Sequence, residues 1–242
     1  MDMIQVDGLS KRYGGKYVVD QLHFEVPQGE VFGLLGPNGA GKTTTLRMLA
    51  TLIRPTAGTA RVGGVDIRQR PLEVRRNLGI VNGGMGLYER MTGEEILRFF
   101  ARFYGIEGPE FKRRLAWVDD LLEMGDLLKK QVREMSSGMQ QKLIIARAVL
   151  HEPPVLLLDE ATAGLDVFAR RALLDFVAHY RTMGHTIIYS THVMAEAEEV
   201  CDRVGFLHQG KLLFIGRIEE ALQRYNTPNL ERAFIRAVRG AA

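Results

Sequence analysis

The sequence predicts an α/β fold in which a helical segment interrupts a sheet-containing core. Three observations indicate this: short β-rich runs alternate with helical patterns, glycines gather between apolar segments, and the strand signal disappears between about residues 84 and 150. Glycine clusters in such positions mark tight turns or phosphate-binding loops. We therefore expect a single domain, residues 1–242, built around one sheet-containing core.

The expected elements follow from the apolar periodicity. Runs rich in β-branched and aromatic residues predict strands at about residues 3–7, 22–26, 31–36, 61–66, 78–82, 155–159, 186–190, 204–208 and 211–215. Apolar residues at helical spacing predict helices from about residues 42, 110, 138, 166 and 193, and at 94–105, 111–128, 218–225 and 230–238. Residues 1–83 and 151–216 would form the core, 84–150 a helical sub-domain and 217–242 C-terminal helices.

The composition is that of an ordinary globular protein, with 46% apolar and 25% charged residues. The single cysteine excludes an intrachain disulfide, and no apolar run approaches the roughly 18–20 residues that span a bilayer. A net charge of +3 is too small to indicate binding to nucleic acid. Because the N-terminus lacks the apolar region of a signal peptide, we expect a cytoplasmic protein.

A phosphate-binding motif follows the strand-like segment VFGLLG. Gly36 to Thr43 match G-x-x-x-x-G-K-[ST] in full, and a helical pattern comes next. In such a loop, glycines let backbone N–H groups surround phosphate oxygens, the lysine neutralises β- and γ-phosphates, and the threonine ligates Mg2+. A simple glycine-rich turn is the alternative, but the full motif in this context favours nucleotide binding. The predicted contacts are Gly36, Pro37, Asn38, Gly39, Ala40, Gly41, Lys42, Thr43 and Thr44, with Thr43 also a metal ligand.

Two carboxylates follow a strand in the second half of the chain. In PPVLLLDE, four apolar residues precede Asp159 and Glu160, as in a buried strand that ends at the carboxyl edge of a sheet. Asp159 can hold Mg2+ through water, and Glu160 can polarise an attacking water. The alternative is a core strand that ends in a solvated acidic turn. His192 follows the strand-like TIIYST, so we expect it beside Glu160, either as a γ-phosphate sensor or as a polar strand end.

Four motifs occur in the order GPNGAGKTT, MSSGMQQ, VLLLDEATAGLD and STH. This order resembles the nucleotide-binding subunit of ATP-binding cassette (ABC) transporters, over nearly the whole chain. The resemblance implies a P-loop NTPase core with a mixed sheet, an antiparallel β sub-domain and an inserted helical sub-domain, with ATP and Mg2+ as ligands. It also implies a head-to-tail dimer, in which each ATP lies between the phosphate loop of one chain and the signature segment of the other.

The resemblance implies further site residues. MSSGM resembles the family signature usually written LSGGQ; Ser136 and Gly138 are retained, while a serine replaces one glycine and a methionine the glutamine. Tyr13 matches the aromatic residue that stacks on adenine, and Asp166 the residue that contacts the opposite chain near its phosphate loop. Taken alone, Ser136 and Asp166 are equally good helix caps, and Tyr13 is an ordinary surface tyrosine.

The resemblance also implies partners. A separate ABC transporter membrane subunit would receive the motion of dimer closure, and GLYERMT resembles the segment that meets it. The other partner would be a second copy or a homologous ATP-binding subunit. This arrangement would place the protein on the inner face of the cell membrane. The sequence is most similar to single-domain ATPases of drug, lipid or sodium exporters, including the sodium-efflux Nat type.

Two other functions remain open at this point. One is a soluble ABC-type ATPase that acts as an assembly scaffold, which only analogy with the family separates from a transport ATPase. The other is a phosphoryl-transferring kinase, which conflicts with the MSSGM and STH segments and for which the sequence has no recognisable acceptor site. Copurification with a membrane protein would favour a transport ATPase, and a phosphorylated small-molecule product would favour a kinase.

One position departs from the family pattern. Most members have a glutamine about four residues after the glycine of LGIVN, and Gly83 stands at that place here. We predict that Gly83→Gln leaves ATP binding nearly intact and alters hydrolysis or its coupling to the partner, because the missing amide is a candidate contact to Mg2+ and water. Nucleotide binding and the partner-stimulated ATPase rate test this, and an unchanged stimulated rate would show that the position is unimportant.

Overall fold

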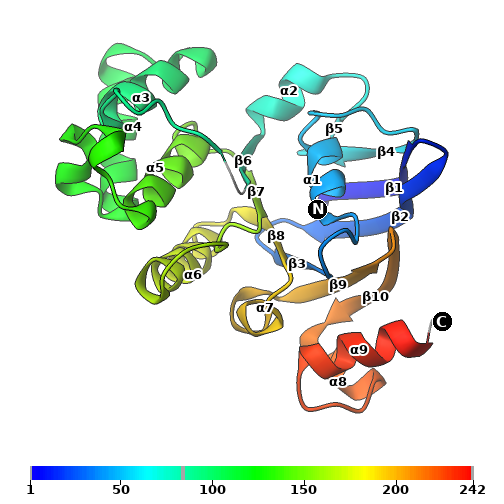
Figure 1. Cartoon of the computed structure of the whole chain (residues 1–242). Coiled ribbons are helices and arrows are strands. Elements are labelled where there is room, and N and C mark those ends of the chain that lie inside the picture. The colour runs from blue at the N-terminus through cyan, green and yellow to red at the C-terminus, as the bar shows by residue number, and fades with distance from the viewer. Residues whose placement is uncertain (1, 83–84, 241–242) are drawn as a thin grey trace.

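A computed structural model describes residues 2–82 and 85–240 of the chain (Figure 1). The strands are β1 (Asp2–Tyr13), β2 (Lys16–Pro27), β3 (Val31–Leu35), β4 (Ala57–Val62), β5 (Val65–Asp66), β6 (Leu78–Asn82), β7 (Val155–Asp159), β8 (Thr186–Thr191), β9 (Arg203–His208) and β10 (Lys211–Arg217). The α-helices are α1 (Lys42–Leu49), α2 (Pro71–Arg76), α3 (Gly93–Ala101), α4 (Gly108–Leu122), α5 (Ser137–Val149), α6 (Val167–Thr182), α7 (Met194–Val200), α8 (Ile218–Arg224) and α9 (Leu230–Gly240). Short 3-10 turns lie at Arg102–Tyr104, Gly125–Lys129 and Val132–Glu134.

The strands of the described residues form two sheets. One is antiparallel with the order β2–β1–β4–β5, and the other has the order β10–β9–β3–β8–β7–β6. In the second sheet the strands from β9 to β6 are parallel and only the edge strand β10 is antiparallel. The predicted α/β class is therefore confirmed, together with the mixed sheet and the antiparallel sheet that the resemblance implied.

Strand β7 lies in the middle of the core and is buried on both faces. Leu156 and Leu158 belong to the apolar cluster that includes residues of α5 and α6, whereas Val155 and Leu157 belong to the cluster around α1 and the antiparallel sheet. Alternate residues of a strand point to opposite faces, so a strand covered on both sides needs an uninterrupted apolar run. Figure 1 shows this arrangement, with α3–α6 on one side of β6–β8 and α1 on the other.

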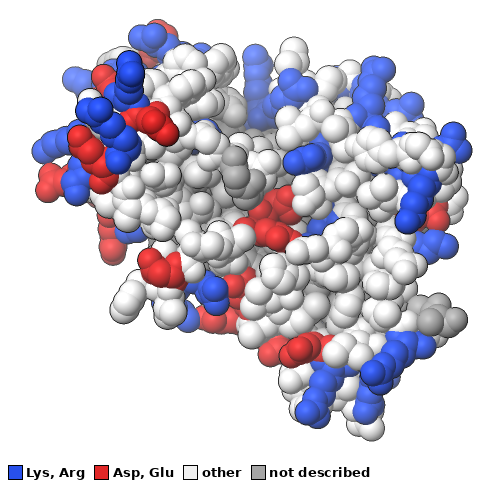
Figure 2. Space-filling view, viewed as in Figure 1, with Lys and Arg blue, Asp and Glu red and all other residues white. Residues whose placement is uncertain are grey.

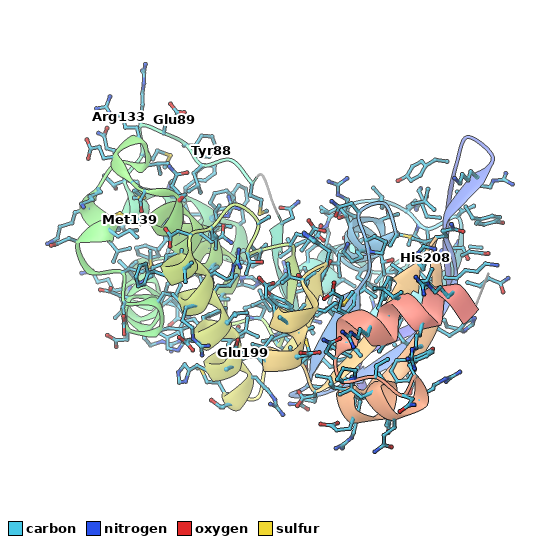
Figure 3. All side chains as sticks on the ribbon, turned by 60° about the horizontal axis from the view of Figure 1, so that its bottom comes forward. Tyr88, Glu89, Arg133, Met139, Glu199 and His208 are labelled. Atoms are coloured by element: carbon cyan, nitrogen blue, oxygen red, sulfur yellow. The ribbon has the colours of Figure 1, made fainter. Side chains whose placement is uncertain are left out.

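Helices α3, α4 and α5 pack together into a helical part, residues 93–149. Helix α3 begins with a capping box: the Thr92 hydroxyl accepts from the Glu95 N–H at 3.3 Å, and the Glu95 carboxylate accepts from the Thr92 N–H at 2.8 Å. Figure 3 shows Tyr88, Glu89 and Arg133 together at the outer end of this part, where the Arg133 N–H donates to the Glu89 carbonyl at 3.1 Å. In the two described ranges, no helix is long and apolar enough to span a membrane.

The antiparallel sheet differs from the sequence prediction. The single strand expected at 61–66 is wrong, since β4 ends before Gly63 and β5 begins after Gly64. Both glycines have positive φ values, 58° and 77°, and form the turn that reverses the chain. Strands β1 and β2 are also longer than the predicted 3–7 and 22–26, because they continue beyond their apolar centres as an exposed hairpin.

Two helices also differ from the prediction. The sequence pattern did not predict α2, a two-turn helix that begins at Pro71, a residue favoured in the first helical turn. The helix expected over 111–128 is shorter, because α4 ends at Leu122 and the following residue, Glu123, adopts left-handed backbone angles. A 3-10 turn replaces its last part. Short helices with few apolar positions leave little periodic signal in a sequence.

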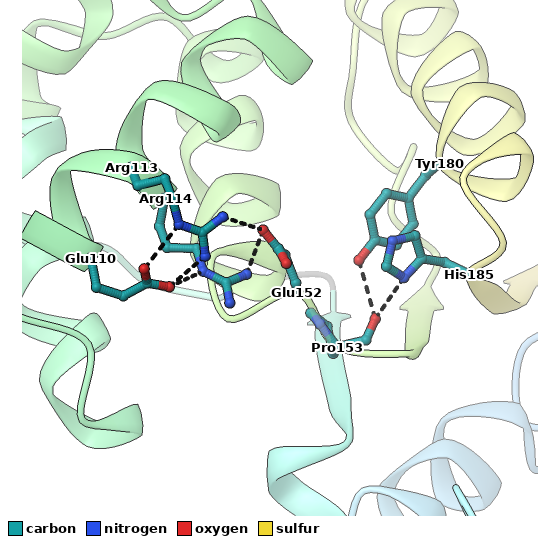
Figure 4. Close-up of polar contacts among 7 residues, drawn as sticks. All are labelled: Glu110, Arg113, Arg114, Glu152, Pro153, Tyr180 and His185. Atoms are coloured by element: carbon teal, nitrogen blue, oxygen red, sulfur yellow. Dashed lines mark hydrogen bonds and ion pairs between the residues drawn. The ribbon is translucent and has the colours of Figure 1, made fainter.

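The segment between α5 and β7 is held from both sides (Figure 4). From the helical part, Arg114 forms an ion pair with Glu152 at 2.5 Å. From the core, the Tyr180 hydroxyl and the His185 Nδ1–H both donate to the Pro153 carbonyl, at 3.2 Å and 2.9 Å. These contacts attach the helical part to the sheet at the point where the chain re-enters the core.

His151 also lies in this segment, with its ring stacked on Tyr104 at a centroid distance of 3.8 Å. Its Nε2–H donates to the Leu78 carbonyl, and burial lowers the pKa of the imidazole from 6.5 to about 4. Below pH 6.5 the unfolded chain therefore binds a proton that the folded chain excludes. We predict that this histidine lowers the free energy of unfolding by about 2 kcal/mol when the pH falls from 7 to 5.

Urea unfolding of wild type and His151→Gln at both pH values checks this prediction. Glutamine can still donate to the Leu78 carbonyl but does not titrate. The stability of the His151→Gln variant should therefore fall less than that of wild type between pH 7 and pH 5. His179→Gln, at an exposed position on α6, is the matched control and should behave as wild type does. Equal losses for wild type and His151→Gln would contradict the prediction.

Candidate functional site

The carboxyl ends of four parallel strands meet at one edge of the mixed sheet. Asn82 at the end of β6 lies opposite Asp159 of β7, which in turn lies opposite Ser190 of β8. Leu35, the last residue of β3, lies opposite Thr191. Because these strand ends are level, the loops that follow β3, β7 and β8 emerge side by side, as expected for a ligand site in a parallel sheet.

The phosphate loop between β3 and α1 is pressed against the neighbouring backbone. A Cβ atom at Gly36 would lie 2.2 Å from the Leu207 carbonyl oxygen, so only glycine fits there. Gly41 has a φ of 111°, and a Cβ there would lie 2.7 Å from the Val18 carbonyl oxygen. The base of the loop is thus fixed by β9 and β2, while its outer residues 37–39 are exposed.

Lys42, the first residue of α1, is 3% exposed and points back into the loop. Its Nζ donates to the carbonyls of Gly36 and Pro37, at 2.7 Å and 3.1 Å. It also lies 3.1 Å from Oε1 of Glu160. The lysine of the phosphate loop and the second predicted carboxylate are therefore in direct contact, and each balances the charge of the other.

Glu160 also contacts His192, whose Nδ1 lies 3.4 Å from the same Oε1. The backbone of Glu160 is left-handed, with a φ of 49°, an uncommon conformation for a residue that is not glycine. Its N–H donates to the Ser190 carbonyl at 2.9 Å, which continues the pairing of β7 with β8 by one residue. The expectation that His192 emerges beside Glu160 agrees with this geometry.

Asp159 precedes Glu160 and is 5% exposed. Its Oδ1 accepts a hydrogen bond of 3.0 Å from the Ser190 hydroxyl. Ser190 is a site residue that sequence reasoning missed, although it stands two positions before His192. Asn82, which faces Asp159 across the sheet, has a buried Oδ1 without a hydrogen-bond partner in the described residues. Gly83, which follows it, lies outside the described residues.

Figure 2 shows how charge is distributed over this side of the molecule. A group of acidic side chains lies near the middle of the face, and most lysine and arginine side chains lie around its margin. Clusters of three or more histidine, cysteine, aspartate or glutamate residues that could enclose a metal are absent from residues 2–82 and 85–240.

Tyr13 lies at the end of β1, in the hairpin that β1 forms with β2. Half of its side chain is exposed, and Lys11 Nζ lies 5.0 Å from the ring centroid. The same hairpin contributes Val18, which touches the phosphate loop at Gly41. Tyr13 therefore belongs to a strand pair that contacts the loop, and its exposed ring is available for stacking on a ligand.

The remaining predicted residues gather on a second surface. Ser136 and Asp166 are the N-caps of α5 and α6; their side chains accept from the N–H groups of Met139 at 3.3 Å and Ala169 at 2.9 Å. Together with Gly138, they line a groove of about 860 Å³ between α4, α5 and α6. None of the phosphate-loop residues lines this groove. The structure therefore brings Lys42, Asp159, Glu160 and His192 to one place and Ser136, Gly138 and Asp166 to another.

Comparisons with known proteins agree with this architecture. The family model described as ABC transporter matches residues 19–163. The ABC transporter ATP-binding protein NatA of Bacillus subtilis (strain 168) is 37% identical over 98% of this chain and 99% of its own length. The daunorubicin/doxorubicin resistance ATP-binding protein DrrA of Streptomyces peucetius is 38% identical over 90% of this chain and 66% of its own.

A solved structure agrees as well. The structure described as that of the ATP-binding subunit of an ABC transporter superposes with a TM-score of 0.88 and 32% identity, over 98% of this chain and 99% of the other. Sequence and structure thus match over almost the full length of both proteins. The chain therefore belongs to the ABC transporter family, as an ATP-binding subunit with ATPase activity.

Proposed function

We propose that this ATPase drives export of a solute by closing on ATP against a second ATP-binding subunit, while a separate membrane subunit receives the motion. The observation that carries the proposal is the division of the predicted residues between two surfaces of one chain. Lys42, Glu160 and His192 contact one another, whereas Ser136 and Asp166 line a different groove. Each chain then holds halves of two ATP sites, and a head-to-tail pair completes both.

In this proposal the phosphate loop binds the triphosphate of ATP. Its backbone is fixed at Gly36 and Gly41, so little ordering is needed on binding. The substrate's γ-phosphate competes with Glu160 for the Lys42 ammonium group, since both are anions within its reach. A Glu160 carboxylate that loses this cation is a better acceptor for the proton of the attacking water.

His192 and Tyr13 have supporting roles in the proposal. His192 contacts Glu160, and from there its imidazole can hydrogen-bond to the terminal phosphate. Tyr13 offers an exposed ring for the adenine base. From the partner chain, Ser136 and the N-terminus of α5 would supply a hydroxyl and a helix dipole to the same triphosphate, and Asp166 would contact the opposite phosphate loop.

The donor set also suits Mg2+. Thr43 offers a hydroxyl on the first turn of α1 and Asp159 a buried carboxylate at the end of β7, which are the oxygen ligands that this ion prefers. Bound there with the substrate phosphates, the ion would neutralise negative charge that develops during phosphoryl transfer. Ser190 fixes the Asp159 carboxylate through its hydrogen bond to Oδ1.

Export as the direction of transport is supported by the names of relatives. One is a linearmycin resistance ATP-binding protein of Bacillus subtilis (strain 168), 34% identical over 99% of this chain. The daunorubicin/doxorubicin resistance protein described above is another. Resistance to a toxic compound is a property that export provides, so we propose the same direction for this chain.

An aromatic patch on the helical part suits the membrane subunit as partner. Tyr88, Phe99 and Phe103 are exposed, and Phe99 contacts Tyr88 and Phe103 edge to face, at centroid distances of 5.9 Å and 5.3 Å. Beside them, the half-buried Arg147 places its guanidinium over the Phe100 ring at 4.8 Å. Exposed aromatic clusters are typical of protein interfaces. Such docking would hold the chain at the inner face of the membrane.

We predict that Glu160→Gln lowers the ATPase kcat by roughly 100-fold or more, while ATP still binds. The amide keeps the shape of the side chain but cannot accept a proton from water. The variant should dimerise in ATP, as measured by light scattering after size exclusion. Glu73→Gln, at an exposed position on α2, is the control and should keep the wild-type rate. A Glu160→Gln chain that stays monomeric in ATP, even with its membrane partner, would contradict sandwich closure.

We predict that Phe103→Ser, alone or with Tyr88→Ser, lowers recovery of the membrane subunit by roughly tenfold, since exposed aromatics dominate interface energies. The measurement is mass spectrometry of proteins that copurify with the tagged chain from detergent-solubilised membranes. Leu72→Ser, at an equally exposed position on α2, should recover the wild-type amount. Equal recovery with all variants would exclude the patch, and absence of any membrane protein with the wild type would favour the soluble scaffold.

A further inference from the structure

A buried carboxylate lies beneath the loops of the site. Glu196, on the first turn of α7, is 4% exposed. Three hydroxyl groups donate to its Oε2: Thr162 at 3.0 Å, Tyr189 at 2.9 Å and Thr191 at 3.1 Å. A carboxylate accepts hydrogen bonds and donates none, so all three hydroxyls must point their protons at this one oxygen.

The three donors come from the segments that carry the proposed catalytic groups. Thr162 stands two residues after Glu160, at the start of the loop between β7 and α6. Thr191 directly precedes His192 at the end of β8, and its hydroxyl also accepts from the Val193 N–H at 3.0 Å. A single buried oxygen thus joins the loop of Glu160 to the strand end of His192.

Glu196 also reaches the loop of the second surface. Its Oε1 is buried, has no hydrogen-bond partner among the described residues and lies 3.6 Å from Nε of Arg170. Arg170 is on the first turn of α6, where its N–H donates to the carbonyl of Asp166 at 3.0 Å. The loop 161–166 is therefore tied to Glu196 near both ends, by Thr162 directly and by Arg170 through charge.

The hydrogen bonds of this cluster are strong and fix the orientation of its hydroxyl groups. Burial raises the pKa of the Tyr189 hydroxyl, and the nearby Glu196 charge raises it further, so the phenol remains a donor. Hydrogen bonds to a charged acceptor are about twice as strong as those between neutral groups. An apolar side chain could fill the same volume without the cost of burying a charge, but it would not fix the direction of three hydroxyls.

We infer that Glu196 is a positioning residue for ATP hydrolysis, which sets the loop of Glu160 and Asp166 in register with His192. It acts through Thr162 and Thr191 and does not touch the substrate. This inference rests on the roles proposed above for Glu160 and His192. Other bonds between these segments, from the Glu160 N–H to the Ser190 carbonyl and from the Ser190 hydroxyl to Asp159, lie at the strand ends and do not reach Thr162.

The matched pair Thr162→Val and Thr162→Ser tests the inference with little risk to folding. Valine keeps the shape of threonine and removes the hydroxyl, whereas serine keeps the hydroxyl. We expect Thr162→Val to lower kcat roughly tenfold with the KM for ATP within about twofold, because one charge-assisted hydrogen bond is lost while the phosphate loop is untouched. Thr162→Ser should restore kcat to within about twofold of wild type.

A double-mutant cycle separates positioning from a general effect on stability. Glu196→Gln should lower kcat roughly tenfold or more in the wild type, but less than about twofold in a His192→Ala background, where one of the two groups whose relative position it sets is gone. A variant that merely unfolds in part loses the same fraction of active protein, and so the same factor in kcat, in both backgrounds. Thermal unfolding of all the chains measures that fraction independently.

Several outcomes would overturn the inference. The inference is wrong if Glu196→Gln lowers kcat by the same factor in the wild-type and His192→Ala backgrounds. It is also wrong if Thr162→Val and Thr162→Ser have equal kcat values. If Glu160→Gln and His192→Ala lose activity while Thr162→Val and Glu196→Gln keep it, the positioning role is wrong and the proposed site stands. If Glu160→Gln and His192→Ala both keep wild-type rates, the proposed site and the inference fail together. If Glu196→Gln does not fold, the Thr162 pair decides.

Discussion

Parallel pairing of β6, β7, β8 and β3, with their carboxyl ends level, determines where this protein can place charge. Asp159 and Ser190 face each other across that edge, and Leu35 and Thr191 do the same one strand further. The loops that leave these ends are therefore neighbours in space although they are far apart along the chain. Without this register, Lys42 of the first loop would not meet Glu160 of a loop more than a hundred residues later.

Polar groups buried under this edge depend on one another. Lys42, Asp159 and Glu196 are each almost inaccessible, and an unpaired charge in such a place costs several kcal/mol. Lys42 is balanced by Glu160, Asp159 accepts from a serine hydroxyl, and Glu196 accepts from three hydroxyls. Removing one partner leaves the other group buried and unsatisfied, so small changes here are expected to affect the geometry of the whole site.

In the proposed head-to-tail pair, the separation of the two surfaces means that two chains must approach each other to complete an ATP site. The groups around Lys42 belong to the sheet edge, whereas Ser136 and Asp166 cap helices that flank a groove on the helical side. The helical part joins the sheet through the short segment 151–154, which is held by contacts from both sides. Rigid attachment at this segment would let a change at the nucleotide reach the aromatic patch, where the membrane subunit is proposed to dock.

Local sequence was enough to predict the α/β class, most strands and helices, the phosphate loop and the strand-end position of Asp159, Glu160 and His192. Each of these depends on neighbouring residues, or on a repeat of two or 3.6 positions that any strand or helix must show. The turn that divides residues 61–66 into two strands and the short helix α2 were not predicted, because their sequence signals span only a few residues. The contact of Lys42 with Glu160, the three hydroxyls on Glu196 and the shared groove of the α5 and α6 caps depended on how distant segments pack. Spacing along a chain does not specify the distance between side chains in space, so only the folded molecule could reveal them.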